Sequence, residues 1–299
     1  GRCIERADLV IEAIFEDKTV KQALYREIEP RMRADALLAS NTSSIPLEEL
    51  APALQRPERL VGLHFFNPVA KMQLVEIVRG KHSSDRAIQQ ALAFTRAIDR
   101  LPLPVTSTPG FLVNRVLMPY LLEAVQIETE GVPATLIDRA AVEFGMPMGP
   151  IELADTVGLD VCLHVARILA ADLNVEVPER LEELVNDGRL GRKNGVGFYT
   201  WHKGKPVKPK PASGYRVPQD MTDRMLLRLF NEARACLREG VVSDADLLDA
   251  GMIFATGFAP FRGGPLHHVG TLGDMTMYRK LQELTSRYGS RFTPDLGWN

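Results

Sequence analysis

Short apolar runs alternate with helix-type patterns over residues 8–106. Over 18–33, apolar positions spaced four residues apart predict an amphipathic helix, namely Val20, Leu24, Ile28 and Met32. Runs of strand type predict strands at 9–14, 36–40, 60–65, 74–78 and 103–106. Further helices are predicted at 46–54, with Ser44 as N-cap, and at 84–99. This alternation is typical of parallel α/β architecture.

From residue 109 the pattern changes to long helices with few β-branched runs. Pro109 suits a first helical turn, since its missing N–H would have no partner there. Gly131 is expected to cap the first helix, and Gly158 to interrupt the third. These helices are predicted at 109–130, 134–144, 150–173 and 178–187. Residues 204–218 are rich in proline and lysine, which predicts an extended linker.

The helical pattern after this linker repeats the pattern before it. Residues 122–132 are echoed by 231–241 at a constant offset, and Gly149-Pro150 is echoed by Gly264-Pro265 at a slightly larger offset. Two helical units of shared ancestry explain this economically. The alternative is a coincidence of helix punctuation. The sequence therefore predicts an α/β region at 1–107, a helical domain at 108–203, the linker at 204–218 and a second helical domain at 219–299.

Composition narrows the choice of partner and compartment. The chain has 36 basic and 38 acidic residues and a net charge of −2, so no overall field attracts a polyanion and we expect no nucleic-acid partner. No apolar run approaches the roughly 20 residues that cross a bilayer. Cys3, Cys162 and Cys236 are far apart, which favours a reducing compartment and no metal site. Because the chain opens without Met and reaches a strand almost at once, we expect a fragment whose beginning was removed.

One histidine lies where catalysis is expected. His64 ends a predicted strand, within the segment Gly-Leu-His-Phe-Phe-Asn-Pro at 62–68. The carboxyl ends of strands border the ligand crevice in open α/β sheets. The alternative is a histidine packed between aromatic side chains and satisfied by a backbone carbonyl. For His64 taken alone, that alternative is the simpler interpretation.

Glu76 changes that balance, because it is a charged residue within the apolar strand 74–78. An unpaired buried carboxylate is costly, so Glu76 needs a donor or a cation. If the two strands are neighbours, Glu76 can accept from one ring nitrogen of His64 and fix its tautomer, which would make His64 a general base. The alternative is an edge-strand glutamate that points at water.

Two other polar segments suit the same pocket. Residues 40–44, Ser-Asn-Thr-Ser-Ser, follow a strand, where hydroxyls and backbone amides could bind a ligand oxygen or phosphate. Their alternative role is helix capping by Ser43 or Ser44. Asn114 falls in the opening turns of the first long helix, and its alternative is a solvent-facing asparagine.

Taken in order, these segments resemble the motifs of the 3-hydroxyacyl-CoA dehydrogenase family. The resemblance rests on Asn-Thr-Ser-Ser at 41–44, the segment 62–68, Leu-Val-Glu at 74–76 and Pro-Gly-Phe-Leu-Val-Asn-Arg at 109–115. Pro-Met-Gly-Pro at 147–150 and the glycine-spaced run at 191–199 are similar to the helical domain of that family. The resemblance covers essentially the whole chain. It implies an α/β partial Rossmann domain, the C-terminal part of an NAD-binding domain, followed by two all-α helical domains that form an internal repeat.

The resemblance also implies a reaction, the oxidation of an L-3-hydroxyacyl-CoA to the 3-ketoacyl-CoA with hydride transfer to NAD. His64 would take the proton of the C3 hydroxyl, and Glu76 would orient and stabilise the charged imidazole. Ser43 and Asn114 would bind the reacting oxygen or the thioester region of the substrate. The positions that match the family's NAD contacts are Ala13, Ile14, Glu16, Lys21, Ser43 and Asn67.

The chain departs from the family pattern in two places. The family's opening strand, its G-x-G-x-x-G turn and the acidic residue for the adenosine ribose have no counterpart, and we expect them upstream of Gly1. The chain alone is therefore expected to bind NAD poorly and to be weakly active or inactive. The second helical unit lacks counterparts of Phe111 and Asn114, so we expect no catalytic role for it.

A second helical copy is similar to the fatty-acid oxidation multifunctional enzymes, in which an enoyl-CoA hydratase domain lies upstream. This resemblance implies an acyl-CoA substrate, a thiolase subunit as partner and no transmembrane segment. It also implies the cytoplasm of a bacterium, or the mitochondrion or peroxisome of a eukaryote. The alternatives are a 3-hydroxybutyryl-CoA dehydrogenase that works reductively and a non-catalytic scaffold fragment. The set Ser43, His64, Glu76 and Asn114 argues against a scaffold.

Overall fold

The computed structural model describes residues 3–173, 175–211 and 214–298. The chain divides into two compact units, one formed by residues 1–114 and 240–247 and the other by residues 115–239 and 248–299. The predicted domain ends at 1–2 and 299 and the linker positions 212–213 lie outside the described residues. In the part that is described, no helix is long and apolar enough to cross a membrane.

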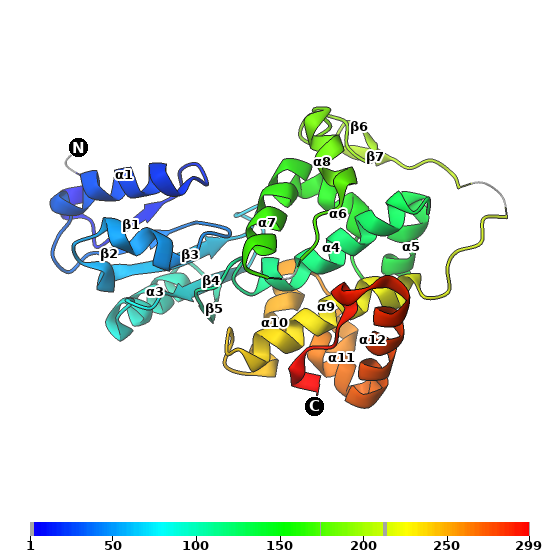
Figure 1. Ribbon diagram of the computed structural model, residues 1–299. Helices are drawn as coiled ribbons and strands as arrows, with labels where there is room; N and C mark the ends of the chain where they lie inside the picture. Colours follow the sequence, from blue (N-terminus) through cyan, green and yellow to red (C-terminus); the bar gives the residue numbers. More distant parts are fainter. Residues whose placement is uncertain (1–2, 174, 212–213, 299) are drawn as a thin grey trace. The chain divides into compact units, whose positions relative to one another are not determined.

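The first unit is built on a five-stranded sheet with the order β1-β2-β3-β4-β5 (Figure 1). Its strands are β1 (Leu9–Glu12), β2 (Leu37–Ser40), β3 (Leu60–Phe65), β4 (Leu74–Arg79) and β5 (Leu101–Thr106). The prediction of a parallel sheet is correct within β1–β3 and within β4–β5 and wrong between β3 and β4, which pair antiparallel. Residues 66–73 are too few for the helical crossover that a parallel pair requires. The chain therefore turns back directly.

The helices of this unit follow the predicted pattern with shorter bounds. Helix α1 (Lys18–Ile28) is N-capped by Asp17, whose carboxylate accepts from Val20 N–H. It ends earlier than predicted because Pro30 follows, and a proline disfavours helical backbone at the residue before it. Helix α3 (Asp85–Ala97) is capped by Ser84. The remaining helical segments are α2 (Leu47–Leu50) and the single turns η1 (Ile4–Arg6), η2 (Glu29–Arg31), η3 (Ala51–Ala53) and η4 (Pro57–Arg59).

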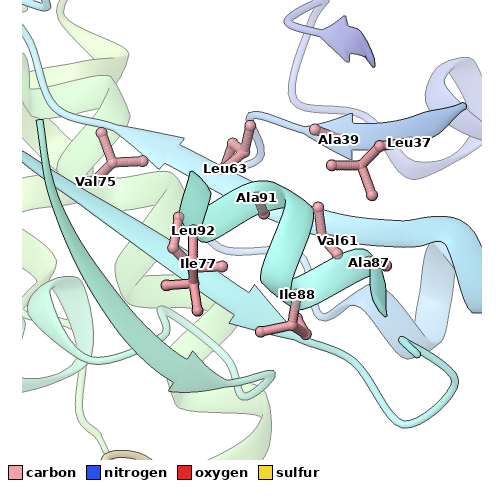
Figure 2. Close-up of a cluster of buried hydrophobic side chains, with 10 residues drawn as sticks. All are labelled: Leu37, Ala39, Val61, Leu63, Val75, Ile77, Ala87, Ile88, Ala91 and Leu92. Atoms are coloured by element: carbon pink, nitrogen blue, oxygen red, sulfur yellow. The ribbon is translucent and has the colours of Figure 1, made fainter. Parts of the chain in front are cut away.

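Helix α3 covers one face of the sheet and forms a hydrophobic core with it (Figure 2). The buried residues of this core are Leu37, Ala39, Val61, Leu63, Val75, Ile77, Ala87, Ile88, Ala91 and Leu92. Each of the larger side chains contributes about 1.5–3 kcal/mol when fully buried. Because a slip of one residue would turn these side chains outward, the core fixes the register of β3 and β4. Side chains alternate along a strand, so His64 and Glu76 lie on the opposite face.

The second unit is helical. It contains most of α4 (Val113–Thr129) and most of α10 (Ala245–Thr256), together with α5 (Ala134–Phe144), α6 (Pro150–Val157), α7 (Leu159–Asp172), α8 (Glu179–Asn186), α9 (Met221–Arg238), α11 (Pro265–Leu272) and α12 (Asp274–Tyr288), with the single turns η5 (Pro260–Arg262), η6 (Ser290–Phe292) and η7 (Leu296–Trp298). The predicted interruption at Gly158 is confirmed, because it separates α6 from α7 with a φ of 108°.

Two details of the helical region differ from prediction. Pro109 does not lie in the first turn of α4, because Gly110 and Phe111 both have positive φ and the helix begins only at Val113. The segment predicted as a linker contains β7 (Lys205–Val207), which pairs with β6 (Thr200–His202) in a small antiparallel hairpin that was not predicted.

The repeat predicted from the sequence has a structural counterpart in how two helices begin. Asp138 Oδ1 accepts from Ile151 N–H at the start of α6, and Asp249 Oδ1 accepts from Leu266 N–H at the start of α11. The glycine before each helix makes room for the aspartate, since a Cβ there would come within 2.2 Å or 2.3 Å of an aspartate atom. The same capping device is therefore used twice.

Candidate active site

His64 and Glu76 lie directly opposite each other on the antiparallel strands β3 and β4. Side chains at paired positions share one face of a sheet and interact. His64 Nδ1 lies 2.6 Å from Oε2 of Glu76, and both side chains are buried. The expected contact between an imidazole and a carboxylate from separate strands is therefore present. When Glu76 is ionised it only accepts, so Nδ1 of His64 is the nitrogen that carries the proton.

The second oxygen of Glu76 is bound by the backbone that leads into α4. Oε1 accepts from Leu112 N–H at 3.0 Å and from Val113 N–H at 2.9 Å. Free N–H groups at a helix start favour a negative charge, so they compensate the burial of this fully enclosed carboxylate. The alternative of an edge-strand glutamate facing water is wrong, because β4 lies between β3 and β5.

Aromatic rings surround the imidazole of His64. Its centroid lies 4.5 Å from the ring of Phe66 and 5.7 Å from that of Phe111. The aromatic part of the simpler interpretation is therefore correct, but the ring nitrogen is satisfied by a carboxylate and not by a carbonyl. No hydrogen bond to Nε2 of His64 is found among the residues that the structure describes. With Nδ1–H held by Glu76, Nε2 presents a lone pair that can take a proton.

The close approach of β3 and β4 next to this pair depends on Gly62. Gly62 pairs with Val78, two residues from His64 and Glu76 on their respective strands. A Cβ at Gly62 would lie 2.6 Å from Cβ of Val78, nearer than two such atoms can come. The strands can therefore keep this spacing only with glycine at this position.

Asn114 and Ser43 are brought together, although 71 positions separate them. Asn114 Nδ2 donates to the carbonyl of Ser43 at 2.9 Å. Asn41, in the same loop, accepts from Phe65 N–H, which directly follows His64. The candidate residues Ser43, His64, Glu76 and Asn114 thus come from a connected set of backbone segments within the first unit.

The predicted capping role of Ser44 is wrong. Helix α2 begins at Leu47, too far along the chain for the Ser44 hydroxyl to cap it, and Leu47 N–H donates to Ser107 Oγ at 2.9 Å. The hydroxyl of Ser44 donates to Glu16 instead. The loop after β2 is therefore organised by Glu16 and not by the helix that follows it.

Glu16 accepts several hydrogen bonds from this loop. Its Oε1 accepts from the Thr42 hydroxyl at 2.6 Å, from Ser43 N–H at 2.7 Å and from Ser44 N–H at 3.1 Å. Burial works against the charge of Glu16, but the hydrogen bond from Thr42 and the ammonium of Lys21 outweigh it. The pKa of Glu16 therefore lies below its ordinary value.

The other positions that match NAD contacts are arranged differently. Ala13, Ile14 and Asn67 are exposed, whereas Lys21 is completely buried. Lys21 Nζ lies 2.7 Å from Oε1 of Glu12 and 3.4 Å from Oε2 of Glu16. Lys21 is thus enclosed between two carboxylates.

Sequence reasoning missed Glu12, the buried carboxylate that binds Lys21 together with Glu16. It carries the same signal as Glu76, a charged residue inside an apolar strand-like run that needs a partner. That partner, Lys21, lies on the following helix one turn before Tyr25, which also binds Glu12.

Comparisons with known proteins identify the family of this chain. Residues 2–108 match the family model of the 3-hydroxyacyl-CoA dehydrogenase NAD binding domain, and residues 110–201 match that of the 3-hydroxyacyl-CoA dehydrogenase C-terminal domain. The (S)-3-hydroxybutyryl-CoA dehydrogenase from Ralstonia eutropha is 37% identical, with a TM-score of 0.65, over 68% of this chain and 73% of its own. The chain therefore belongs to the 3-hydroxyacyl-CoA dehydrogenase family.

Two further relatives match nearly the whole chain. The fatty acid oxidation complex subunit alpha of Shewanella amazonensis is 40% identical over 98% of this chain and 43% of its own length. The 3-hydroxybutyryl-CoA dehydrogenase from Escherichia coli K12 is 28% identical, with a TM-score of 0.86, over 99% of this chain and 81% of its own. The chain thus spans less than half the length of the curated relatives it matches first.

Proposed function

We propose that this chain carries the site that oxidises an L-3-hydroxyacyl-CoA to the 3-ketoacyl-CoA, with NAD as hydride acceptor, in fatty-acid β-oxidation. The observation that carries the proposal is the 2.6 Å contact between Nδ1 of His64 and Glu76. It holds Nδ1 of the ring and directs Nε2 away from Glu76, where a basic nitrogen can take the proton of an alcohol. Membership of the family supplies the reaction class.

In the proposed reaction the O–H bond of the substrate's C3 hydroxyl breaks and its proton goes to Nε2 of His64. The C3–H bond breaks with both of its electrons while the C3–O bond becomes a carbonyl. NAD, when bound, takes up that hydride and becomes NADH. Glu76 stays ionised and stabilises the imidazolium, helped by the N–H groups of Leu112 and Val113.

Ser43 and Asn114 are assigned to the substrate oxygen or the thioester region. The hydrogen bond from the Asn114 side-chain amide to the Ser43 carbonyl, at 2.9 Å, ties these two residues together. The Asn114 amide has a second N–H, and the Ser43 hydroxyl can also donate, so both can bind an oxygen that gains negative character.

The residues assigned to NAD fit a ribose or carboxamide group in part. The carboxylate of Glu16 is accessible, because 24% of its side chain is exposed, and within the described part of the chain its Oε2 has Lys21 as its ionic contact. A carboxylate oxygen of this kind accepts from hydroxyl or amide donors. The exposed residues Ala13, Ile14 and Asn67 complete this set. Lys21 has no exposed surface, so we assign it to the support of Glu16.

His64→Ala tests this proposal in the full-length protein that carries the sequence. With acetoacetyl-CoA as substrate and NADH absorbance as the readout, we expect turnover to fall about 10²- to 10⁴-fold, the range of a general base. His82→Ala, at an exposed histidine after β4, is the matched control and should keep wild-type turnover. Unchanged turnover in His64→Ala would remove the proposed base and leave the scaffold alternative.

The relatives suggest both a context and an alternative substrate. The relatives named fatty acid oxidation complex subunit alpha favour a multifunctional parent in the bacterial cytoplasm, with a thiolase subunit as partner. The relatives named 3-hydroxybutyryl-CoA dehydrogenase favour a short-chain enzyme that works reductively. A comparison of kcat/KM for acetoacetyl-CoA and for a long-chain 3-ketoacyl-CoA separates the two.

A further inference from the structure

A carboxylate that the proposed reaction does not use lies next to the site, at the end of β1. Glu12 is 3% exposed and pairs in register with Ser40 at the end of β2. Its Oε1 accepts from Lys21 Nζ at 2.7 Å and from Ile14 N–H at 2.8 Å. Its Oε2 accepts from Tyr25 and from Ser40, each at 2.8 Å. Four donors thus converge on one buried carboxylate.

Such a group is expensive to bury, and an apolar residue at the end of a strand would avoid the cost. Two of its donors, Tyr25 and Ser40, belong to the core and explain only a packing role. A further donor, Lys21, connects Glu12 to a second carboxylate. Its ammonium also contacts Oε2 of Glu16 at 3.4 Å, so one cation is shared by a fully buried carboxylate and a partly exposed one.

Glu16 passes this constraint on to the loop after β2. The Oε1 atom of Glu16 holds Ser43 N–H and Ser44 N–H, while Oε2 faces Lys21. Rotation of the Glu16 carboxylate would break these backbone hydrogen bonds. The orientation of the loop that carries Ser43 therefore depends on Lys21 remaining where Glu12 holds it.

We propose that Glu12 is a positioning residue of the active site. It fixes Lys21, Lys21 fixes Glu16, and Glu16 fixes the backbone of Ser43. The part that concerns substrate binding rests on the proposed function, because that is where Ser43 has its role. The part that concerns the loop stands on geometry alone.

Glu12→Gln tests the first part without any assay of activity. The variant keeps the shape of the side chain but removes its negative charge, so Lys21 loses its buried counter-ion although the amide oxygen can still accept a hydrogen bond. Measured by amide hydrogen exchange, Ser43 and Ser44 should exchange at least about tenfold faster, while β4 stays protected. The matched control is Glu27→Gln, an exposed glutamate on α1, which should leave exchange unchanged. Unchanged exchange at Ser43 and Ser44 in Glu12→Gln overturns the proposal.

A double variant separates positioning from simple support of the fold. Glu12→Gln with Lys21→Met removes both charges of the buried pair, so Tm should recover relative to Glu12→Gln alone. Turnover should stay about ten- to a hundredfold below wild type, because Glu16 still lacks its cation and small displacements near a reacting group are costly. Recovery of kcat together with Tm would assign Glu12 to stability only and overturn the proposal. If the wild type itself shows no dehydrogenase activity, the proposed function fails while the exchange experiment still decides on the loop.

Discussion

The two helical copies exchange the same ion pairs but differ completely at the end where catalysis is proposed. In each copy an arginine in the first helix binds two glutamates of the other copy, one within its first helix and one directly after that helix ends. The pairs are Arg115 with Glu232 and Glu239, and Arg224 with Glu123 and Glu130. All these positions are related by the constant offset seen in the sequence. This reciprocity is that of a two-fold interface within one chain.

The starts of the two helices have diverged. At the start of α4, Phe111 packs on His64 and Asn114 binds the carbonyl of Ser43. At the positions with the same offset before and in α9, Asp220 accepts from Tyr288 and Asp223 pairs with Lys280. Removal of one partner of a buried ion pair is strongly destabilising, whereas the residues at a helix start can change with less cost. The comparison teaches that the two helical copies share a reciprocal set of ion pairs and differ in the residues at their helix starts.

The largest expected effect tests the reciprocity of the ion pairs. Arg224→Met should lower the free energy of unfolding by about 3 kcal/mol, because the buried Glu123 loses one of its two arginine partners among the described residues and keeps Arg291 at 2.8 Å. Arg115→Met should cost less, about 1–2 kcal/mol, because the side chain of Glu232 is 18% exposed whereas that of Glu123 is 1% exposed. Urea unfolding of both variants measures the difference. Equal losses would show that burial does not control the strength of these pairs.

The next effect concerns the divergent helix starts. Asn114→Ala should lower turnover about a hundredfold, the effect of removing one donor to a reacting oxygen. Asp223→Ala, at the corresponding position of the second copy, should leave turnover within about twofold of wild type. Steady-state kinetics with acetoacetyl-CoA gives both numbers. A comparable loss in Asp223→Ala would mean that the second copy does take part in catalysis.

The capping aspartates should show a smaller contrast. Asp249→Ala should cost about 1 kcal/mol of unfolding free energy, the usual value of a lost N-cap. Asp138→Ala should cost about 2 kcal/mol, because it also leaves the buried Tyr199 hydroxyl without its acceptor at 2.8 Å. Thermal unfolding ranks the two variants, and the reverse order would contradict this assignment.

The smallest effect is a pH dependence in the first unit. The pKa of Glu16 is lowered from its ordinary value of 4.5, so its stabilising effect is complete above that pH and is lost as the pH falls through the lowered pKa. The difference in unfolding free energy between wild type and Glu16→Gln should therefore be constant above about pH 5 and shrink in stronger acid. A difference that grows as the pH falls would give the shift the opposite sign.

The sequence predicts those features that depend on local pattern or on a single unpaired charge. The strand at 60–65 and the helix at 134–144 have the bounds that periodicity indicates. Glu76 could be matched to His64 because a charge inside an apolar strand demands a partner. The antiparallel direction of β4 follows from the short connection between β3 and β4, which the apolar pattern does not reveal. The late start of α4 depends on positive φ at Gly110 and Phe111, which the apolar pattern does not encode either. Lys21 was assigned by resemblance, and its enclosure by Glu12 and Glu16 became visible only with the packing.

Gly62 contributes to the site although it has no reactive group. A methyl group there would push Val78 away and open the two strands beside the base and its acid. A designed sheet that carries the same histidine and glutamate pair would therefore also need a glycine at the matching position of the first strand. The geometry of the His64–Glu76 pair thus depends in part on a position without a side chain.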